Sequence, residues 1–212
     1  MQCYGDFKQI ALALQNYEAT YGSLPPAYLT DSKGRPTLSW RVLILPFMGQ
    51  DSLYRSFNLS EPWDSPTNIK LLGEMPGVLG CPNRSWDIKS GRTKCVAITG
   101  PGTMFPGATS AKFADVADGL DETIMLAEVE NLSVPWTAPV DLNIRTMSLR
   151  PNDPKTPGIS SPHSSPHSSG PAVCSGAGQV AFVPRWISPE EMKALMTIAG
   201  HESPYAWSSL RW

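Results

Sequence analysis

The most regular hydrophobic pattern of the chain lies close to its start. Apolar side chains recur at three- and four-residue steps from Phe7 through Ile10 to Leu14, which is the spacing of a helix that buries one face. The pattern predicts a helix over residues 6–20. Gly22 follows it, and glycine commonly ends helices. We therefore expect one side of this helix to cover a core.

Shorter patterns predict further helices. Residues 40–57 are rich in large apolar side chains and are interrupted by Pro46, so two short helices joined at the proline are expected. Residues 67–74 are expected to form a third. Ser188 and the Pro-Glu-Glu after it have the order of a helix start, with an N-cap residue, a proline and a glutamate in their preferred places. They predict a helix that runs to about Ala199.

Strand signals begin in the middle of the chain. Residues 94–99 and 123–129 are short β-branched or apolar runs between clusters of Gly, Pro and Asp, which is typical of strands. Two further runs, 172–175 and 179–183, flank the Gly-Ala-Gly sequence of residues 176–178. Because a glycine-rich turn between two apolar runs favours an antiparallel pair, we expect a hairpin there.

Together these elements predict an α+β fold, with the N-terminal helix packed on a small antiparallel sheet, short inserted helices and long loops. The length of 212 residues favours a single domain over residues 1–212. The high content of proline and glycine, 21 and 17 residues, indicates a loop-rich chain. Residues 150–171 are mostly Pro, Ser, Gly and His, and we expect them to form a surface loop.

The charge balance bears on possible partners. The chain has 17 basic and 19 acidic residues and a net charge of −2, and the basic residues are scattered along it. This distribution argues against nucleic acid as a partner. No apolar run is long enough to span a membrane, so the chain as given is expected to be soluble.

The cysteines do not form a recognisable motif. Because none of them is spaced as C-x-x-C, the sequence predicts neither a zinc knuckle nor a thioredoxin-type redox pair. Two interpretations stay open: small buried apolar side chains, or one disulfide in an oxidising compartment. The four residues are Cys3, Cys81, Cys95 and Cys174.

Long ungapped strings carry a family resemblance. The most specific are residues 7–17, 21–28, 39–46 and 61–66, and shorter matches are residues 100–103, 118–119, 128–129, 152–154 and 158–163. In these strings the chain resembles the pseudopilin-like proteins abundant in planctomycete genomes, the prepilin-type processing-associated H-X9-DG domain proteins. The resemblance covers nearly the whole chain.

The resemblance implies a structural role. Members normally begin with a leader and an apolar helix of about 20 residues that anchors them in the inner membrane, and Met1 stands where that helix should be ending. We therefore expect the ectodomain of a subunit for a type II secretion or type IV pilus-like assembly. Its partners would be other pseudopilin-like subunits, bound through the N-terminal helix that is absent here. The expected location is extracytoplasmic, with membrane contact only through that missing helix.

The family signature is a histidine separated by nine residues from an Asp-Gly pair. Here nine residues separate His167 from Ala177-Gly178, so an alanine stands where relatives have aspartate. The loss of this turn-forming carboxylate puts its role in doubt for this chain. We still expect an ordered hairpin, because Gly176 and Gly178 can supply the positive φ angles of a tight turn.

An acidic segment around Gly119 is the candidate metal site. Hard cations such as calcium are held by several oxygens from one tight loop, and the type II secretion pseudopilins that this chain resembles in plan hold calcium in an acidic loop. Asp115, Asp118 and Asp121 are therefore candidate calcium ligands. The alternative is a solvated turn capped by aspartate, and no other cofactor is expected.

Seven tryptophans raise the question of a binding surface. Trp40 and Trp63 lie within apolar or family strings and are expected to be packed. The less constrained ones are candidates for an interface: Trp136, Trp186, Trp207 and Trp212. A surface of this kind would fit the alternative function, an extracytoplasmic module that binds a ligand or a polysaccharide.

Catalysis is not expected. His163, His167 and Cys174 lie close in sequence, and a Cys/His pair is the minimum for thiol catalysis. A catalytic site also needs a rigid frame, whereas both histidines lie in the Ser/Pro-rich segment. The sequence therefore favours a non-enzymatic structural subunit.

Overall fold

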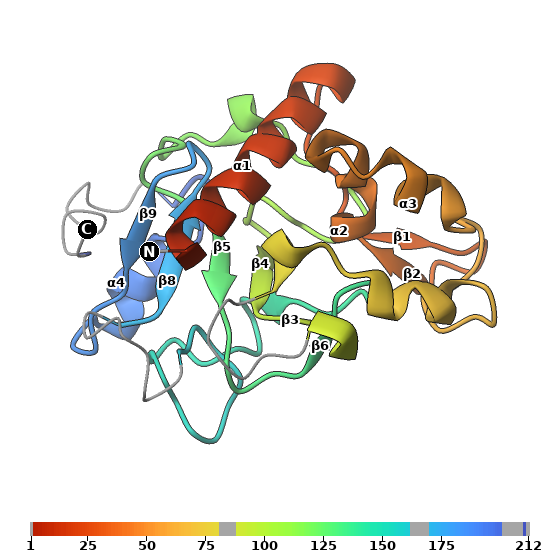
Figure 1. The fold of residues 1–212 in the computed structure, drawn as a ribbon. Coiled ribbons are helices and arrows are strands. Elements are labelled where there is room, and N and C mark those ends of the chain that lie inside the picture. The colour runs from red at the N-terminus through yellow and green to blue at the C-terminus, as the bar shows by residue number, and fades with distance from the viewer. Residues whose placement is uncertain (1, 81–87, 162–169, 201–209, 211–212) are drawn as a thin grey trace.

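The computed structural model describes residues 2–80, 88–161, 170–200 and 210. Its first element is helix α1, Gln2–Tyr21, which confirms the helix predicted over residues 6–20 and extends it at its start. The next residue, Gly22, has a φ of 74° and donates its N–H to the carbonyl of Glu18, an arrangement that ends helices. The helix runs diagonally across the sheet (Figure 1).

Two small two-stranded sheets flank the main one. Strands β1 (Tyr28–Thr30) and β2 (Pro36–Ser39) pair antiparallel soon after α1. Strands β3 (Arg92–Thr93) and β6 (Val134–Pro135) form the second antiparallel pair.

Residues 40–57 form three short helical elements where the sequence predicts two. They are α2 (Trp40–Leu43), the 3-10 helix η1 (Leu45–Met48) and α3 (Asp51–Ser56). Pro46 lies in the first turn of η1, because a proline there lacks only an N–H that the helix does not use. Gly49 then ends η1 with a φ of 70°.

Four further 3-10 helices lie in the part of the chain that the structure describes. The one over residues 68–74 agrees with the short helix predicted over 67–74. They are η2 (Asn68–Glu74), η3 (Gly77–Leu79), η4 (Ile88–Ser90) and η5 (Phe113–Asp115).

The main sheet has the strand order β7-β4-β5-β8-β9. Neighbours pair antiparallel, except that β7 runs parallel to β4. The strands predicted near residues 94–99 and 123–129 and the predicted hairpin are all confirmed. The bounds are β4 (Cys95–Thr99), β5 (Ile124–Glu128), β7 (Leu142–Asn143), β8 (Ala172–Ser175) and β9 (Val180–Phe182).

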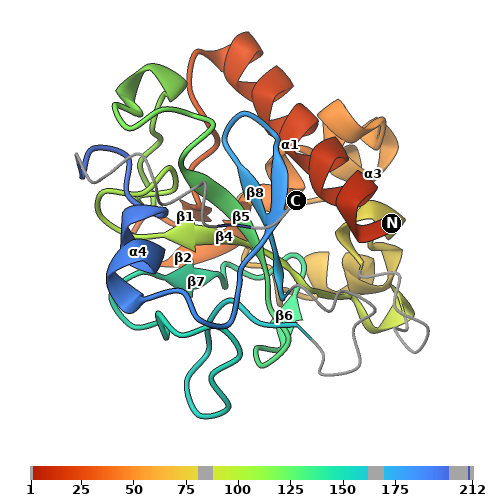
Figure 2. The same ribbon diagram turned by 90° about the vertical axis from the view of Figure 1, so that its left-hand side faces the viewer.

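The sheet is buried on both faces. Alternate residues of a strand point to opposite faces, so Cys95 and Ala97 belong to the apolar cluster under α1, whereas Val96 and Ile98 belong to the cluster on the other side. Helix α4 (Pro189–Ala194) covers that second face. Figure 2 shows α1 and α4 on opposite sides of the sheet. The fold class is therefore α+β, as the sequence predicts.

Helix α4 begins as predicted and ends early. The hydroxyl of Ser188 accepts from the N–H of Glu191, and the carboxylate of Glu191 accepts from the N–H of Ser188, which is a capping box. The helix stops at Ala194 and does not reach Ala199, because the carbonyl of Leu195 accepts a hydrogen bond from Ile124 of β5 at 2.6 Å. The end of α4 is therefore bonded to the sheet.

Part of the Pro/Ser-rich segment is packed inside the fold. Ile159 is 1% exposed, and Ser160 donates its N–H to the carbonyl of Glu128. The expectation of a surface loop is wrong for residues 158–161, because apolar packing and backbone hydrogen bonds hold them against β5. Residues 162–169 lie outside the described part of the chain.

Candidate functional site

The signature turn between β8 and β9 is an ordered hairpin loop. Gly178 donates its N–H to the carbonyl of Ser175 at 3.0 Å and has a φ of 83°. A β-turn followed by a residue in the left-handed region is a common three-residue hairpin loop. The two glycines differ: only Gly178 has a positive φ, whereas Gly176 lies in a crowded place, where a Cβ would be 2.7 Å from Cε of Met104 and would displace that flexible side chain.

The turn is bonded to the elements around it. Gln15 of α1 donates its side-chain amide to the carbonyl of Gly176 at 3.1 Å. On the other side, Gly176 and Ala177 donate their N–H groups to the carbonyls of Thr123 and Leu120. The turn thus joins α1 to the entry of β5, whereas the Ala177 side chain itself is exposed. His167, the other half of the signature, lies outside the described residues.

Restoring the family aspartate is expected to change stability little. Ala177→Asp places a carboxylate on an exposed position of a turn whose left-handed residue is already a glycine. The gain in the free energy of unfolding should not exceed about 1 kcal/mol, the scale of one local hydrogen bond. Denaturant unfolding of both versions measures it. A gain several times larger, or one that needs added metal, would assign a binding role to this position.

The structure does not bring the three candidate calcium ligands together. Asp115 accepts from the N–H of Lys112, Asp118 from the N–H of Gly200, and Asp121 from the amide of Gln179, at 2.8–2.9 Å. Each carboxylate is hydrogen-bonded to a different segment. In the described part of the chain no group of three His, Cys, Asp or Glu side chains could hold a metal ion. The capped-turn alternative fits Asp115, which caps its own 3-10 helix, whereas Asp118 and Asp121 accept from residues distant in sequence.

The thiol of Cys174 is not disposed for nucleophilic chemistry. It is fully buried under α1, and burial raises its pKa to about 12, whereas a reactive cysteine needs a thiolate. Cys95 is also buried and free, and burial raises its pKa as well. Both act as small apolar core residues. His163 lies outside the described residues, as do Cys81 and the side chain of Cys3.

The candidate interface tryptophans differ in environment. Trp136 is fully buried, its indole N–H donates to the carbonyl of Leu72 at 3.0 Å, and its ring meets Phe57 edge to face. The expectation of an interface role for Trp136 is therefore wrong, because the ring is part of the core. Trp186 is 62% exposed and stays a candidate. Trp207 and Trp212 lie outside the described residues.

A buried ion pair lies at the centre of a further group of hydrogen bonds. Asp141 accepts hydrogen bonds at one carboxylate oxygen from Arg41 at 2.6 Å and from the Ala97 N–H at 2.7 Å. The indole of Trp40 approaches the same oxygen at 3.3 Å. Arg41 donates twice more to the carbonyl of Cys95 and once to the hydroxyl of Ser39. The cluster joins α2 to the start of β4.

This cluster is enclosed. The side chain of Arg41 is 0% exposed and that of Asp141 is 4% exposed. Burial raises the pKa of Asp141, and the Arg41 guanidinium opposes that shift. The sequence contains one signal that could have indicated the pair: Arg41 is the only charged residue in the apolar run from Trp40 to Leu45. Its partner, Asp141, lies 100 residues further along the chain and does not stand in an apolar run of this kind.

A second carboxyl group with a raised pKa belongs to α1. Asp6 is half-buried, and burial raises its pKa from 3.8 to about 6. Between these values only the folded state holds the proton, so the free energy of unfolding falls as the pH rises from about 4 to about 6. Above pH 6 the Asp6 carboxylate is ionised in both states, and the full cost of burying its charge lowers the free energy of unfolding.

Replacing Asp6 by asparagine is expected to remove this penalty. Because water screens a half-buried carboxylate, Asp6→Asn should raise the free energy of unfolding by only about 1 kcal/mol at pH 7. The gain should vanish near pH 4. Denaturant unfolding at the two pH values measures it, with Asp64→Asn at an exposed position as the control. An equal gain at both pH values would contradict the electrostatic explanation.

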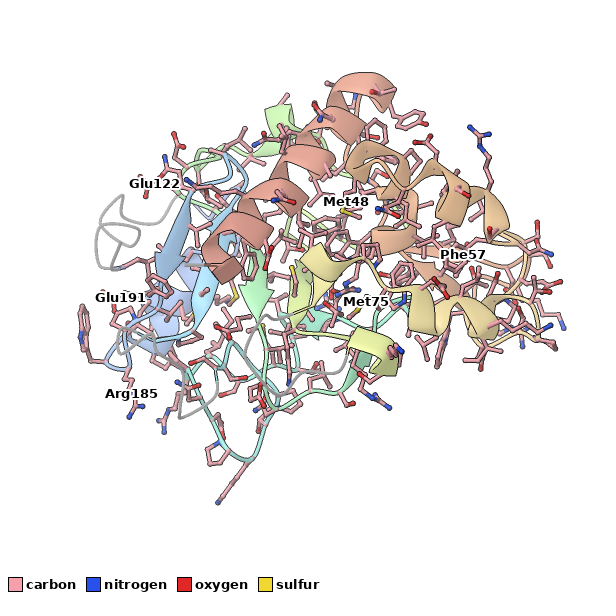
Figure 3. The ribbon with its side chains drawn as sticks, viewed as in Figure 1. Met48, Phe57, Met75, Glu122, Arg185 and Glu191 are labelled. Carbon is pink, nitrogen blue, oxygen red and sulfur yellow. The ribbon has the colours of Figure 1, made fainter. Side chains whose placement is uncertain are left out.

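A groove of about 400 Å³ lies beside α1. Its walls come from three places in the chain: Gln9 and Leu12 of α1, Phe47 and Met48 of η1, and Pro76 and Val78 near η3. None of the residues that line it is charged. Met48 lies next to α1 in Figure 3. Leu12 is 56% exposed, so the groove presents apolar surface to solvent, and its volume is in the range of ligand sites.

Three aromatic rings cluster near this groove. Tyr17 and Tyr21 have their ring centroids 4.5 Å apart, and both meet Phe47 edge to face at 5.6 and 6.1 Å. Tyr21 is 65% exposed. Because Phe47 also lines the groove, the rings and the groove form one continuous surface. Sequence periodicity places Tyr17 on the buried face of the helix and gives no signal for this surface.

Comparison with known proteins adds a family and no function. A family model described as a protein of unknown function (DUF1559) matches residues 1–147. No curated protein and no solved structure matches the chain. In the described part of the structure, no helix combines the length and apolarity needed to cross a bilayer.

Proposed function

The chain belongs to the DUF1559 family of proteins of unknown function, and we propose that it is a non-enzymatic structural subunit. In this proposal it is the ectodomain of a pseudopilin- or prepilin-like protein that works in a type II secretion or type IV pilus-like assembly. Its location is extracytoplasmic. Its partners are other subunits of the same kind, and it contacts the membrane only through an apolar helix that precedes α1.

The packing of α1 supports this proposal. Phe7, Ile10 and Leu14 are buried against the main sheet, so the helix is fixed to the domain along its length. Its opposite side carries the exposed Leu12. A helix held in this way can transmit force between a preceding segment and the domain. The buried, protonated thiols of Cys95 and Cys174 agree with a role that needs no nucleophile.

Crosslinking in the source cells tests the proposal. A photoreactive residue at the exposed position Asn16 of α1 should link the full-length protein to further subunits in the cell envelope. The same residue at the exposed position Lys155, outside α1, serves as the matched control and should link less. Recovery of the protein only as a cytoplasmic monomer, with no link from Asn16, contradicts the proposal.

One observation favours the alternative, an extracytoplasmic module that binds a ligand or a polysaccharide. The cluster of Tyr17, Tyr21 and Phe47 presents an exposed ring beside a groove without charge, and sugars stack on such rings. Titration with neutral oligosaccharides, followed by tyrosine and tryptophan fluorescence, tests it. Binding that is lost in Tyr21→Ala supports the alternative. No change in fluorescence at millimolar sugar contradicts it.

A further inference from the structure

Trp186 is presented at the tip of a rigid turn. The N–H of Ile187 donates to the carbonyl of Pro184 at 3.3 Å, and both of these residues are buried. The two residues between them, Arg185 and Trp186, are exposed. The capped start of α4 follows directly. An exposed indole held in this way loses little conformational freedom on binding, which favours a role as an anchor.

The turn and the groove lie on different sides of the molecule. Trp186 lies three residues before Pro189, the first residue of α4, and Figure 2 shows α4 and α1 on opposite sides of the sheet. Figure 3 likewise places Arg185 far from Met48, which lines the groove. Contact between the two surfaces within one chain is therefore excluded. A contact between two chains would be head to tail, and it would leave one turn and one groove free at the ends.

We propose that Trp186 of one copy inserts into the groove beside Leu12 of a second copy. The proposal rests on the assembly role given above and assigns it a contact between globular domains. Size supports the occupant, because the groove of about 400 Å³ is large enough for an indole and is open at the exposed Leu12. Apolar lining with no charge suits an aromatic ring.

Charge is complementary across this contact. Arg185 adjoins the indole on the turn. Two exposed acidic residues are neighbours of lining residues: Asp51 follows Gln50, and Glu74 precedes Pro76 by two positions. One exposed cation, Lys8, precedes the lining residue Gln9, so the rim is basic on the side of α1 and acidic on the side of residues 50–76. Opposite charges at the rim orient partners and suppress wrong pairings more than they add affinity. The turn therefore approaches the groove with its cation toward the acidic side of the rim.

The contact is expected to be weak in solution. One side chain in one groove, with its rim, falls below the roughly 1,200 Å² that stable interfaces bury. Assembly of full-length subunits through their N-terminal helices would raise the local concentration and make a weak contact effective. The isolated chain should therefore associate only at high concentration.

Sedimentation velocity at roughly 0.5 mM, where weak contacts become populated, provides the test. The wild-type chain should show a sedimentation coefficient that rises with concentration. Trp186→Ala removes the anchor and Leu12→Asp closes the groove, and each variant alone should stay monomeric. An equimolar mixture of the two should form a heterodimer and nothing larger, because one variant keeps the groove and the other keeps the indole.

Ile69→Ala, at another exposed apolar position that is 38% exposed, is the matched control and should associate like the wild type. Circular dichroism checks that all variants are folded. A monomeric wild type, an associating Trp186→Ala, or a mixture that fails to pair overturns the proposal. Envelope crosslinks from Asn16 that persist in Trp186→Ala cells would show that only this contact, and not the assembly role, is wrong.

Discussion

Asp141→Ala is expected to lower the free energy of unfolding by about 3 to 5 kcal/mol, the cost of removing one partner from a buried ion pair. The reason is the charge left behind. Arg41 is fully buried, and without Asp141 its guanidinium keeps two neutral hydrogen-bond acceptors, the carbonyl of Cys95 and the hydroxyl of Ser39, and its contact with the Trp40 ring. The N–H of Ala97 also loses its acceptor. Denaturant unfolding at neutral pH measures the change.

Two variants separate this effect from a general loss of charge. Asp31 forms an exposed ion pair with Arg35, in which the arginine side chain is 73% exposed, and Asp31→Ala should cost far less. The double variant Arg41→Met, Asp141→Leu removes both buried charges and should recover much of the loss. If the double variant is as unstable as Asp141→Ala, the stranded charge is not the cause.

Trp136→Ala is expected to destabilise the fold by about 3 to 5 kcal/mol, the usual cost of truncating a buried aromatic side chain. The indole is 0% exposed and packs against Phe57, and its N–H satisfies the carbonyl of Leu72. Truncation therefore leaves a cavity and a buried carbonyl without its donor. Thermal and denaturant unfolding both report the change.

Trp186→Ala is the matched control, because it removes the same side chain from an exposed turn. Its effect on the monomer should be small, about 0.5 kcal/mol or less. Similar losses in the two variants would mean that Trp186 is also packed, which would remove the basis for an anchor role. The pair therefore tests the assignment of one tryptophan to the core and the other to the surface.

Local patterns predicted the elements that depend on neighbours in sequence. The periodicity from Phe7 to Leu14 indicated α1, and the pair of apolar runs around residues 176–178 indicated the hairpin. The start of α4 could be predicted because a capping box involves only Ser188 and Glu191. The end of α4 could not be predicted, since it depends on a hydrogen bond to β5.

The environment of single polar and aromatic residues could not be predicted in this way. Arg41 and Asp141 are 100 positions apart, and Trp136 meets Leu72 across 64 positions. No local spacing records such contacts. The acidic segment shows the converse: Asp118 and Asp121 are close in sequence, yet they bond to residues 82 and 58 positions away. Proximity along the chain therefore suggested a cluster of calcium ligands, whereas in the folded chain these carboxylates bond to different segments.

The position of the β8–β9 hairpin in the sheet has a consequence for biosynthesis. Residues 172–182 form the two strands on one side of β5, and Cys174 lies against the carbonyl of Phe7 across 167 positions. Helix α1 is thus synthesised well before the hairpin strand that packs against it. Such distant pairing slows folding and prolongs exposure of apolar surface. The underside of α1 is therefore the surface of the nascent chain that most needs a chaperone.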